Sequence, residues 1–384
     1  MTLPAFLSDP AVGAIFDALP HARIVGGAVR DALIGRAVAD IDLATPDTPD
    51  AVAAALARSG IRCVPTGLDH GTQTAVVNGR GYEITTLRRD VETDGRHAVV
   101  AFTDDWREDA ARRDFTINAM SMTRDGAVFD YFGGQADLRA GIVRFVGDAA
   151  TRIAEDYLRI LRFFRFFARY GGTPDPAAVA AIRDALPGLA GLSVERVWSE
   201  VSRILAAPEP VAAIALMDER GVLAAVLPEG TSVPNLARLV QAAAPADPIL
   251  RLAALLTGGA SDLALRLKLS AAERDRLLAI RQPNVLTPEA DDDALRRALA
   301  DVEPAVLLDR LWLAGGGAPG WAALRDRLAA MPRPVFPLEG RDVLALGVPP
   351  GPEVGVRLRA VRAWWWHRGC QDSAEACRAE LRRR

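Results

Sequence analysis

Residues 24–42 combine a pair of glycines with a pair of aspartates, and this stretch constrains the fold more than any other part of the chain. Gly26 and Gly27 follow a short apolar run and precede a predicted helix. Asp40 and Asp42 follow on a predicted strand, where alternate side chains point to the same face. The pattern therefore predicts a tight strand–helix turn next to a strand with two carboxylates on one face.

Two neighbouring carboxylates repel each other unless a cation lies between them. Oxygen ligands at the spacing of Asp40 and Asp42 suit Mg²⁺, which completes its coordination with waters and substrate phosphates. The glycine turn and the start of the following helix, which carries Arg30, offer N–H groups and a guanidinium to such phosphates. We therefore predict a Mg²⁺-dependent phosphoryl or nucleotidyl transfer site, with Asp40 and Asp42 as metal ligands.

The first 148 residues are predicted to form a mixed α/β region with a small sheet. Glu83, on a predicted strand, is either a third acidic group of the site or a solvated strand residue. Residues 89–104 are charged with weak periodicity, which indicates a long loop. The predicted strands cover residues 23–25, 40–44, 61–65, 72–77 and 81–87.

Two further groups of arginines allow two interpretations each. Arg112 and Arg113 lie among acidic residues, so they form either a surface ion-pair cluster or a clamp for a triphosphate. Residues 152–170 are predicted to form one helix, on which Asp156 and the arginines that follow it recur every three residues. That polar stripe is either satisfied by neighbouring carboxylates or forms a surface for nucleotide or RNA phosphates. From residue 151 onward the pattern is helical throughout.

Composition limits the class of protein. The formal charge of −3 argues against binding nucleic acid through bulk electrostatics, so RNA binding would require local basic patches. No uncharged apolar run has the length of a membrane span, and the first residues show no signal peptide. Three scattered cysteines fit neither a disulfide framework nor a zinc site. We therefore expect a cytoplasmic protein without membrane association.

Taken together, the motifs resemble those of the class II tRNA nucleotidyltransferases and bacterial poly(A) polymerases. The resemblance covers nearly the whole chain and runs through several motifs in order. These are Val-Gly-Gly-Ala-Val-Arg-Asp at 25–31, Asp-Ile-Asp at 40–42, Arg-Arg-Asp-Phe-Thr-Ile-Asn-Ala at 112–119, Glu-Asp-Tyr-Leu-Arg at 155–159 and Leu-Ser-Val-Glu-Arg at 192–196.

The resemblance implies an α+β chain whose polymerase-β-like head, with a small mixed sheet, precedes an all-α neck, body and tail. The implied bounds are 1–148 for the head, 149–207 for the base-recognising neck, 208–331 for the body and 332–384 for the tRNA-binding tail. It also implies that Asp40 and Asp42 are catalytic through two Mg²⁺ ions. The implied nucleotide-binding residues are Gly26, Gly27, Arg30, Arg113, Asp156, Arg159, Arg162 and Arg165.

The implied activity is addition of CCA to the 3′ end of tRNA from CTP and ATP, without a nucleic-acid template. A poly(A) polymerase or an A-adding enzyme shares this chemistry and is the alternative; the chain lacks a strongly basic extension, which favours CCA addition. An alternative from a different class of protein is an inactive RNA-binding module. The intact pair of Asp40 and Asp42 argues against this alternative. The glycines do not form the G-x-G-x-x-G of a dinucleotide-dependent dehydrogenase. The predicted loop 89–104 is a candidate for the switch from CTP to ATP.

Overall fold

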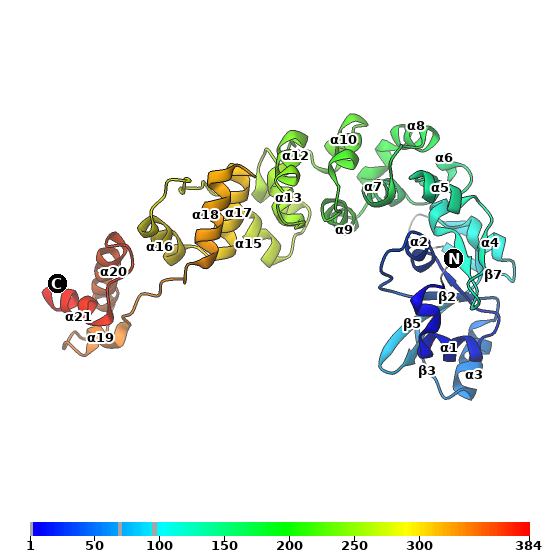
Figure 1. The fold of residues 1–384 in the computed structure, drawn as a ribbon, viewed down its shortest axis with the longest axis horizontal. Coiled ribbons are helices and arrows are strands. Elements are labelled where there is room, and N and C mark those ends of the chain that lie inside the picture. Colours follow the sequence, from blue (N-terminus) through cyan, green and yellow to red (C-terminus); the bar gives the residue numbers. More distant parts are fainter. Residues whose placement is uncertain (1–2, 68–70, 94–97) are drawn as a thin grey trace. The chain divides into compact units, whose positions relative to one another are not determined.

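The computed structural model describes residues 3–67, 71–93 and 98–384. The chain divides into two compact units, Met1–Val226 and Leu227–Arg384, and each is described by itself. The first unit contains both sheets and the helices that carry the predicted site, and the second is entirely helical. The predicted α+β class, with a mixed sheet near the N-terminus followed by helices, is therefore confirmed (Figure 1).

The main sheet has seven strands in the order β3-β4-β5-β2-β1-β8-β9. All neighbouring pairs are antiparallel except β2 and β5, which run parallel, so the sheet is mixed as predicted. The hairpin between β4 and β5 turns at Asn78 and Gly79, which both have positive φ, as a two-residue Asn-Gly turn requires. The strands are β1 (Arg23–Val25), β2 (Asp42–Thr45), β3 (Arg62–Gly67), β4 (Thr72–Val77), β5 (Arg80–Thr86), β8 (Met120–Met122) and β9 (Val128–Asp130).

The predicted start of the second strand at Asp40 is wrong, because β2 begins at Asp42. The antiparallel register pairs Val25 with Asp42, so the next pair toward Asp40 would involve Gly26. Gly26 has a φ of 66° and turns the chain into a helix, which ends β1. Asp40 therefore lies in the segment before β2, where β1 has no residue left to pair with it.

The prediction of a long loop over residues 89–104 is also wrong. Strands β6 (Arg88–Thr93) and β7 (Ala98–Phe102) pair antiparallel in a separate two-stranded sheet. Residues 94–97, which join them, lie outside the described residues. The hairpin was missed because its first strand is dominated by charged residues, while the Asp-Gly pair at 94–95 is a sequence signal that favours a hairpin.

Helices of the first unit surround the sheet and continue beyond it. α1 begins after the N-cap Asp9, whose side chain accepts a hydrogen bond from the Ala11 amide, and it contacts α3. A 3₁₀ helix at Ala5–Ser8 precedes α1, and two more follow at Thr116–Asn118 and Leu186–Gly191. The α-helices are α1 (Pro10–Ala18), α2 (Gly27–Leu33), α3 (Pro49–Arg58), α4 (Trp106–Ala111), α5 (Gly134–Ala140), α6 (Ala149–Glu155), α7 (Leu158–Tyr170), α8 (Pro176–Asp184), α9 (Val194–Leu205), α10 (Val211–Glu219) and α11 (Val222–Val226).

The predicted single helix over residues 152–170 is interrupted at Asp156. α6 ends at Glu155, and α7 begins at Leu158. Asp156 has an extended backbone, and its carboxylate accepts a hydrogen bond from the Leu158 amide at 3.1 Å. An aspartate side chain that bonds a nearby backbone N–H competes with helix continuation. The arginines of α7 keep the predicted stripe, but Asp156 lies in the break before them.

Aromatic packing fixes α7 against the head. The ring of Phe115, within the motif at 112–119, is fully buried, and its centroid lies 4.8 Å from that of Phe145 and 5.3 Å from that of Phe166 of α7. Phe163 of α7 stacks on Phe145 with ring centroids 6.1 Å apart. Burying several aromatic rings in one cluster gives large stabilisation, so the polar side of α7 is held firmly toward the head.

The second unit contains short helices around small apolar cores. One core gathers leucines of α16, α17 and α18, and another surrounds Trp365, which is 2% exposed. No described helix combines the length and the apolar character that a membrane crossing requires. The helices are α12 (Val233–Gln241), α13 (Pro248–Leu255), α14 (Ala260–Arg266), α15 (Ala271–Ile280), α16 (Asp292–Asp301), α17 (Pro304–Gly315), α18 (Pro319–Ala330), α19 (Gly340–Leu344), α20 (Pro352–His367) and α21 (Ala374–Arg383).

Candidate active site

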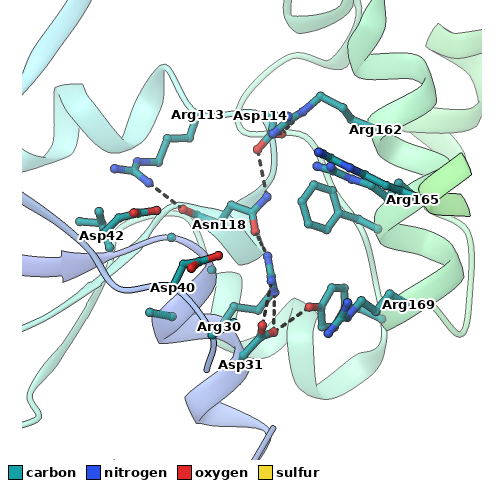
Figure 2. Close-up of a pocket in the computed structure, with 18 of the residues that line it drawn as sticks. Arg30, Asp31, Asp40, Asp42, Arg113, Asp114, Asn118, Arg162, Arg165 and Arg169 are labelled. Atoms are coloured by element: carbon teal, nitrogen blue, oxygen red, sulfur yellow. Dashed lines mark hydrogen bonds and ion pairs between the residues drawn. The ribbon is translucent and has the colours of Figure 1, made fainter. Parts of the chain in front are cut away.

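A cavity of about 1020 Å³ in the first unit is lined by every residue that the sequence predicted for the site. The residues come from the turn into α2, the segment leading into β2, the loop after α4, and the region from the α6–α7 break through α7. Figure 2 shows how the labelled side chains converge on this space. The predicted residues are Gly26, Gly27, Arg30, Asp40, Asp42, Arg113, Asp156, Arg159, Arg162 and Arg165.

Three carboxylates lie at the head side of the cavity. The parallel register pairs Leu43 with Ile84, which are both buried, so the preceding residues Asp42 and Glu83 share the opposite face of the sheet. Burial raises the pKa of Asp42, and the nearby carboxylates of Glu83 and Asp40 raise it further. Glu83, whose role the sequence left open, therefore lies beside the aspartate pair.

The aspartate pair offers part of a ligand set for a divalent cation. Within the described ranges, no hydrogen bond or ion pair engages the Asp40 or Asp42 carboxylate, so their negative charge is not balanced at contact distance. Among the described residues, no three His, Cys, Asp or Glu side chains are arranged so that they could hold a metal ion together, so the aspartate pair offers only part of a ligand set. A partial set of carboxylate ligands is typical of Mg²⁺, which keeps waters and takes substrate phosphate oxygens.

The glycine turn lets Arg113 approach the start of α2. Gly26 has φ 66° and ψ −124°, a conformation that residues with a Cβ rarely adopt. A Cβ at Gly26 would also lie 3.2 Å from Nη1 of Arg113, closer than most real contacts. The turn thus requires glycine both for its backbone angles and for the space beside Arg113.

A chain of hydrogen bonds joins Arg30 of α2 to Arg162 of α7 (Figure 2). Nη1 of the buried Arg30 donates to Oδ1 of Asn118 at 2.5 Å, and Nδ2 of Asn118 donates to Asp114 at 3.1 Å. The other oxygen of Asp114 accepts from Nε of Arg162 at 2.8 Å. These bonds hold the pKa of Asp114 below its usual value, although burial alone would raise it. Asp114 therefore remains a carboxylate and fixes Arg162 at the cavity.

Asp109 organises the arginine pair of the 112–119 motif. Its buried carboxylate pairs with Arg112 at 2.7 Å and with Arg113 at 3.2 Å. Nε of Arg112 also donates to the carbonyl of Arg88, the first residue of β6. Arg113 donates to the carbonyl of Asn118 at 3.3 Å. The arginine pair therefore forms ion pairs with a buried carboxylate and also lines the cavity, and its role as a triphosphate clamp stays a prediction.

The α7 end of the cavity is equally supported by ion pairs. Asp156 pairs with Arg196 of α9 at 2.7 Å, and Arg159 pairs with Glu155 and donates to the Arg152 carbonyl. Arg165 pairs with Glu200 of α9 at 3.2 Å. The stripe is thus satisfied by carboxylates, as one interpretation predicted, while its arginines still line the cavity.

Sequence reasoning missed several residues that support the site. Asn118 and Asp109 connect the arginines, and Asp31 pairs with Arg30 and accepts from the Tyr170 hydroxyl at 2.7 Å. Asn118 follows Asp114 by four residues within the motif at 112–119, and this position is the sequence signal that could identify Asn118 as a site residue. The partnership of Asp31 with Tyr170 joins residues far apart in the chain and has no local signal.

Comparisons with known protein families agree with this geometry. Residues 22–144 match the Poly A polymerase head domain, which spans the aspartate pair and the 112–119 motif. Residues 173–233 match the probable RNA and SrmB-binding site of polymerase A.

Individual relatives match over most of the chain. The mitochondrial CCA tRNA nucleotidyltransferase 1 of Danio rerio is 38% identical over 89% of this chain and 83% of its own length. The CCA-adding enzyme of Geobacillus stearothermophilus is 34% identical over 88% of this chain and 87% of its own. A crystal structure of the Bacillus stearothermophilus CCA-adding enzyme in complex with CTP superposes with a TM-score of 0.77 at 29% identity, covering 97% and 96% of the two chains. This chain therefore belongs to the family of CCA tRNA nucleotidyltransferases.

Proposed function

We propose that this protein adds CCA to the 3′ end of tRNA, using CTP and ATP and releasing pyrophosphate. The observation that carries the proposal is the convergence of all ten predicted residues, from separate parts of the sequence, on one cavity. Relatives named as CCA-adding enzymes over most of the chain support the same substrates. The proposed reaction is in-line attack of the RNA 3′-oxygen on the α-phosphate of the nucleotide.

Asp40 and Asp42, with Glu83 beside them, would hold Mg²⁺, and we propose that the site binds two such ions. Bound there, the metal supplies charge neutralisation for the triphosphate and lowers the pKa of the RNA 3′-hydroxyl. Arg30 and Arg113, which line the cavity with Gly26 and Gly27, would bind the triphosphate. These groups would hold the nucleotide triphosphate in position for attack by the RNA 3′-oxygen. Positioning of the reactants is a large part of how proteins accelerate phosphoryl transfer.

Base selection is proposed for the α7 side of the cavity. Asp156 accepts from an exocyclic amine, which cytosine and adenine both carry, and Arg159 hydrogen-bonds the same base edge. The ion pair of Asp156 with Arg196 leaves the carboxylate able to accept further bonds and fixes its orientation. Arg162 and Arg165 would complete the nucleotide site from the next turns of α7.

We propose the neck (149–207), body (208–331) and tail (332–384) as the RNA-binding part, with contacts mostly to shape and backbone. The β6–β7 hairpin, in place of the predicted loop, is the candidate for the change from CTP to ATP. The hairpin is connected to the site at Arg88, the first residue of β6, whose carbonyl accepts a hydrogen bond from Arg112. Replacing residues of the hairpin should spare C addition and impair A addition; equal loss of both would contradict this role.

We propose a cytoplasmic location. Cys63, Cys370 and Cys377 are all free thiols, which suits a reducing compartment. Two other relatives are named mitochondrial enzymes, in mouse and human, so fractionation of the native cells with antibody detection is the test.

The deciding experiment incubates the purified protein with tRNA that ends before CCA and with each labelled nucleotide. Incorporation of C followed by A supports the proposal, whereas incorporation of A alone assigns an A-adding enzyme or a poly(A) polymerase. No incorporation with retained tRNA binding would favour an inactive RNA-binding module.

Asp42→Ala tests the metal ligands in the same assay. Turnover should fall by at least about 10³-fold, because the charge that holds the metal is removed. The melting temperature should change little, because Asp42 is exposed and, within the described residues, its carboxylate makes no hydrogen bond or ion pair that the substitution would remove. Asp50→Ala, an exposed carboxylate in the first turn of α3, is the matched control and should keep full activity. Unchanged turnover of the Asp42 variant would refute the assignment.

A further inference from the structure

The second unit contains a cavity of its own, which no part of the proposed reaction uses. It has a volume of about 280 Å³ and lies where helices α12, α13, α15 and α17 meet. Three arginines line it: Arg238 on α12, Arg281 directly after α15, and Arg310 on α17. These residues were not singled out by any sequence motif.

The positive charge of this cavity is not balanced by the protein. Arginines elsewhere in the same unit are often paired with carboxylates, as Arg276 is with Asp247 and Asp309, both at 2.8 Å. Within the described ranges, which include the whole second unit, Arg238, Arg281 and Arg310 have no ion pair with a carboxylate. Three guanidinium groups around one small cavity give it a positive potential that attracts anions.

Neutral carbonyl groups fix two of the three guanidinium groups in place. Arg281 donates to the carbonyls of Ala253 (3.2 Å), Leu256 (2.6 Å) and Gly258 (3.2 Å), around the end of α13. Arg310 donates through Nε and Nη2 to the carbonyl of Ala279, at 2.9 and 2.7 Å. Burial lowers the pKa of Arg310 from its usual value.

Capping of helix ends accounts for these bonds but not for the accumulated charge. A helix C-terminus carries only about half a negative charge. Arg238 contributes nothing to such capping, because it donates to the side chain of Asn235 at 3.2 Å and is otherwise exposed. Capping bonds therefore fix two of the three guanidinium groups, and the exposed Arg238 adds a third positive charge at the same cavity.

The aromatic residue of the cavity indicates which part of a ligand it suits. Trp312 lies against the guanidinium of Arg325, whose central carbon is 3.4 Å from the ring centroid. The same ring packs on the apolar core around Leu239 and Leu250. Because these contacts already occupy Trp312, the cavity favours a compact anion over a stacked base.

We propose that this cavity binds a phosphoryl oxyanion through Arg238, Arg281 and Arg310. The phosphate comes either from the backbone of the RNA or from free phosphate or pyrophosphate, and the chemistry of recognition is the same. The RNA source rests on the proposed function, whereas the free-anion source does not.

The test compares the wild type with Arg238→Gln and with the double variant Arg238→Gln/Arg310→Gln. Fluorescence anisotropy measures binding of a labelled tRNA that ends before CCA, from 50 to 200 mM salt, and equilibrium dialysis in EDTA measures bound radioactive phosphate and pyrophosphate. Arg274→Gln is the matched control, because this exposed arginine lies on α15 but does not line the cavity. Urea unfolding verifies that each variant folds; Arg238→Gln keeps the test valid if the double variant does not.

For the RNA source, the double variant should lose about 5- to 20-fold in tRNA affinity, and the slope of log affinity against log salt should fall by about 0.9 for one lost duplex phosphate contact. For the free-anion source, the wild type should bind one more phosphate or pyrophosphate per chain than the double variant. Wild-type values of both quantities in folded variants would overturn the proposal. Neither the tRNA-binding nor the phosphate-binding measurement requires nucleotide transfer. If the protein transferred no nucleotide, the proposed function would be refuted and this test would still be valid.

Discussion

Asp114→Asn tests whether the chain of hydrogen bonds from Arg30 to Arg162 stabilises the first unit. The Asp114 carboxylate accepts from Nε and Nη2 of Arg162 on one oxygen, and from Asn118 Nδ2 and the Phe115 amide on the other. Asparagine keeps an oxygen for Asn118 and Phe115, but it turns an NH₂ group toward the guanidinium. The variant therefore loses two charge-assisted bonds and places a donor against a cation.

The magnitude follows from burial. Breaking a buried ion pair costs about 3–5 kcal/mol when the remaining charge stays buried. The Arg162 side chain is 34% exposed, so it regains part of its hydration, and we expect a loss of about 2–3 kcal/mol. For a unit of this size, that corresponds to a melting temperature lower by about 4–12 °C. Calorimetry of the whole chain gives this transition, with Asp184→Asn as control, because the Arg183–Asp184 pair is 64% and 70% exposed.

The effect should depend on pH in a fixed direction. The pKa of Asp114 is lowered in the folded protein, so its contribution is fully present above the unfolded pKa of about 4 and is lost as the pH falls toward the folded value. The difference between wild type and variant should therefore be constant near neutral pH and shrink below about pH 4. A shift no larger than that of the Asp184 control at pH 7, or a difference that grows on acidification, would refute the reasoning.

Two further substitutions test other parts of the site. Gly26→Ala should cost about 1–3 kcal/mol because of its positive φ, and it should raise the KM for nucleotide because the new Cβ displaces Arg113; equal urea midpoints for variant and wild type would contradict the strain argument. Arg196→Met removes the partner of Asp156, so the preference for CTP and ATP over other nucleotides should weaken about tenfold or more, with little change in stability since both side chains are partly exposed. Nucleotide competition assays measure this preference, and unchanged selectivity would show that Arg196 does not orient Asp156.

The head was predictable where local rules decide the structure. The Asn78–Gly79 turn, the N-cap at Asp9 and the glycine turn at Gly26 each follow from backbone preferences of single residues. The ten site residues were identified through ordered motifs, and the structure brings them to one cavity.

The remainder depends on contacts between distant segments. Nothing in the local pattern around Asp156 shows that Arg196, forty residues later, pairs with its carboxylate. The same limit applies to Asp31 and Tyr170. The start of β2 at Asp42 rather than Asp40 follows from the register with β1, which only the assembled sheet defines.

The position of β2 within the sheet sets the order in which parts of the head open. β2 is hydrogen-bonded on both sides, to β1 and to β5, whereas in the described part of the chain β6 and β7 pair only with each other. Each amide hydrogen of β2 lies in one of two ladders that enclose the strand from both sides, and Leu43 is fully buried, so Leu43 should exchange among the slowest of the head, while β6 is held by a single ladder. The backbone that carries Asp42 thus stays rigid on the timescale at which the hairpin opens and closes.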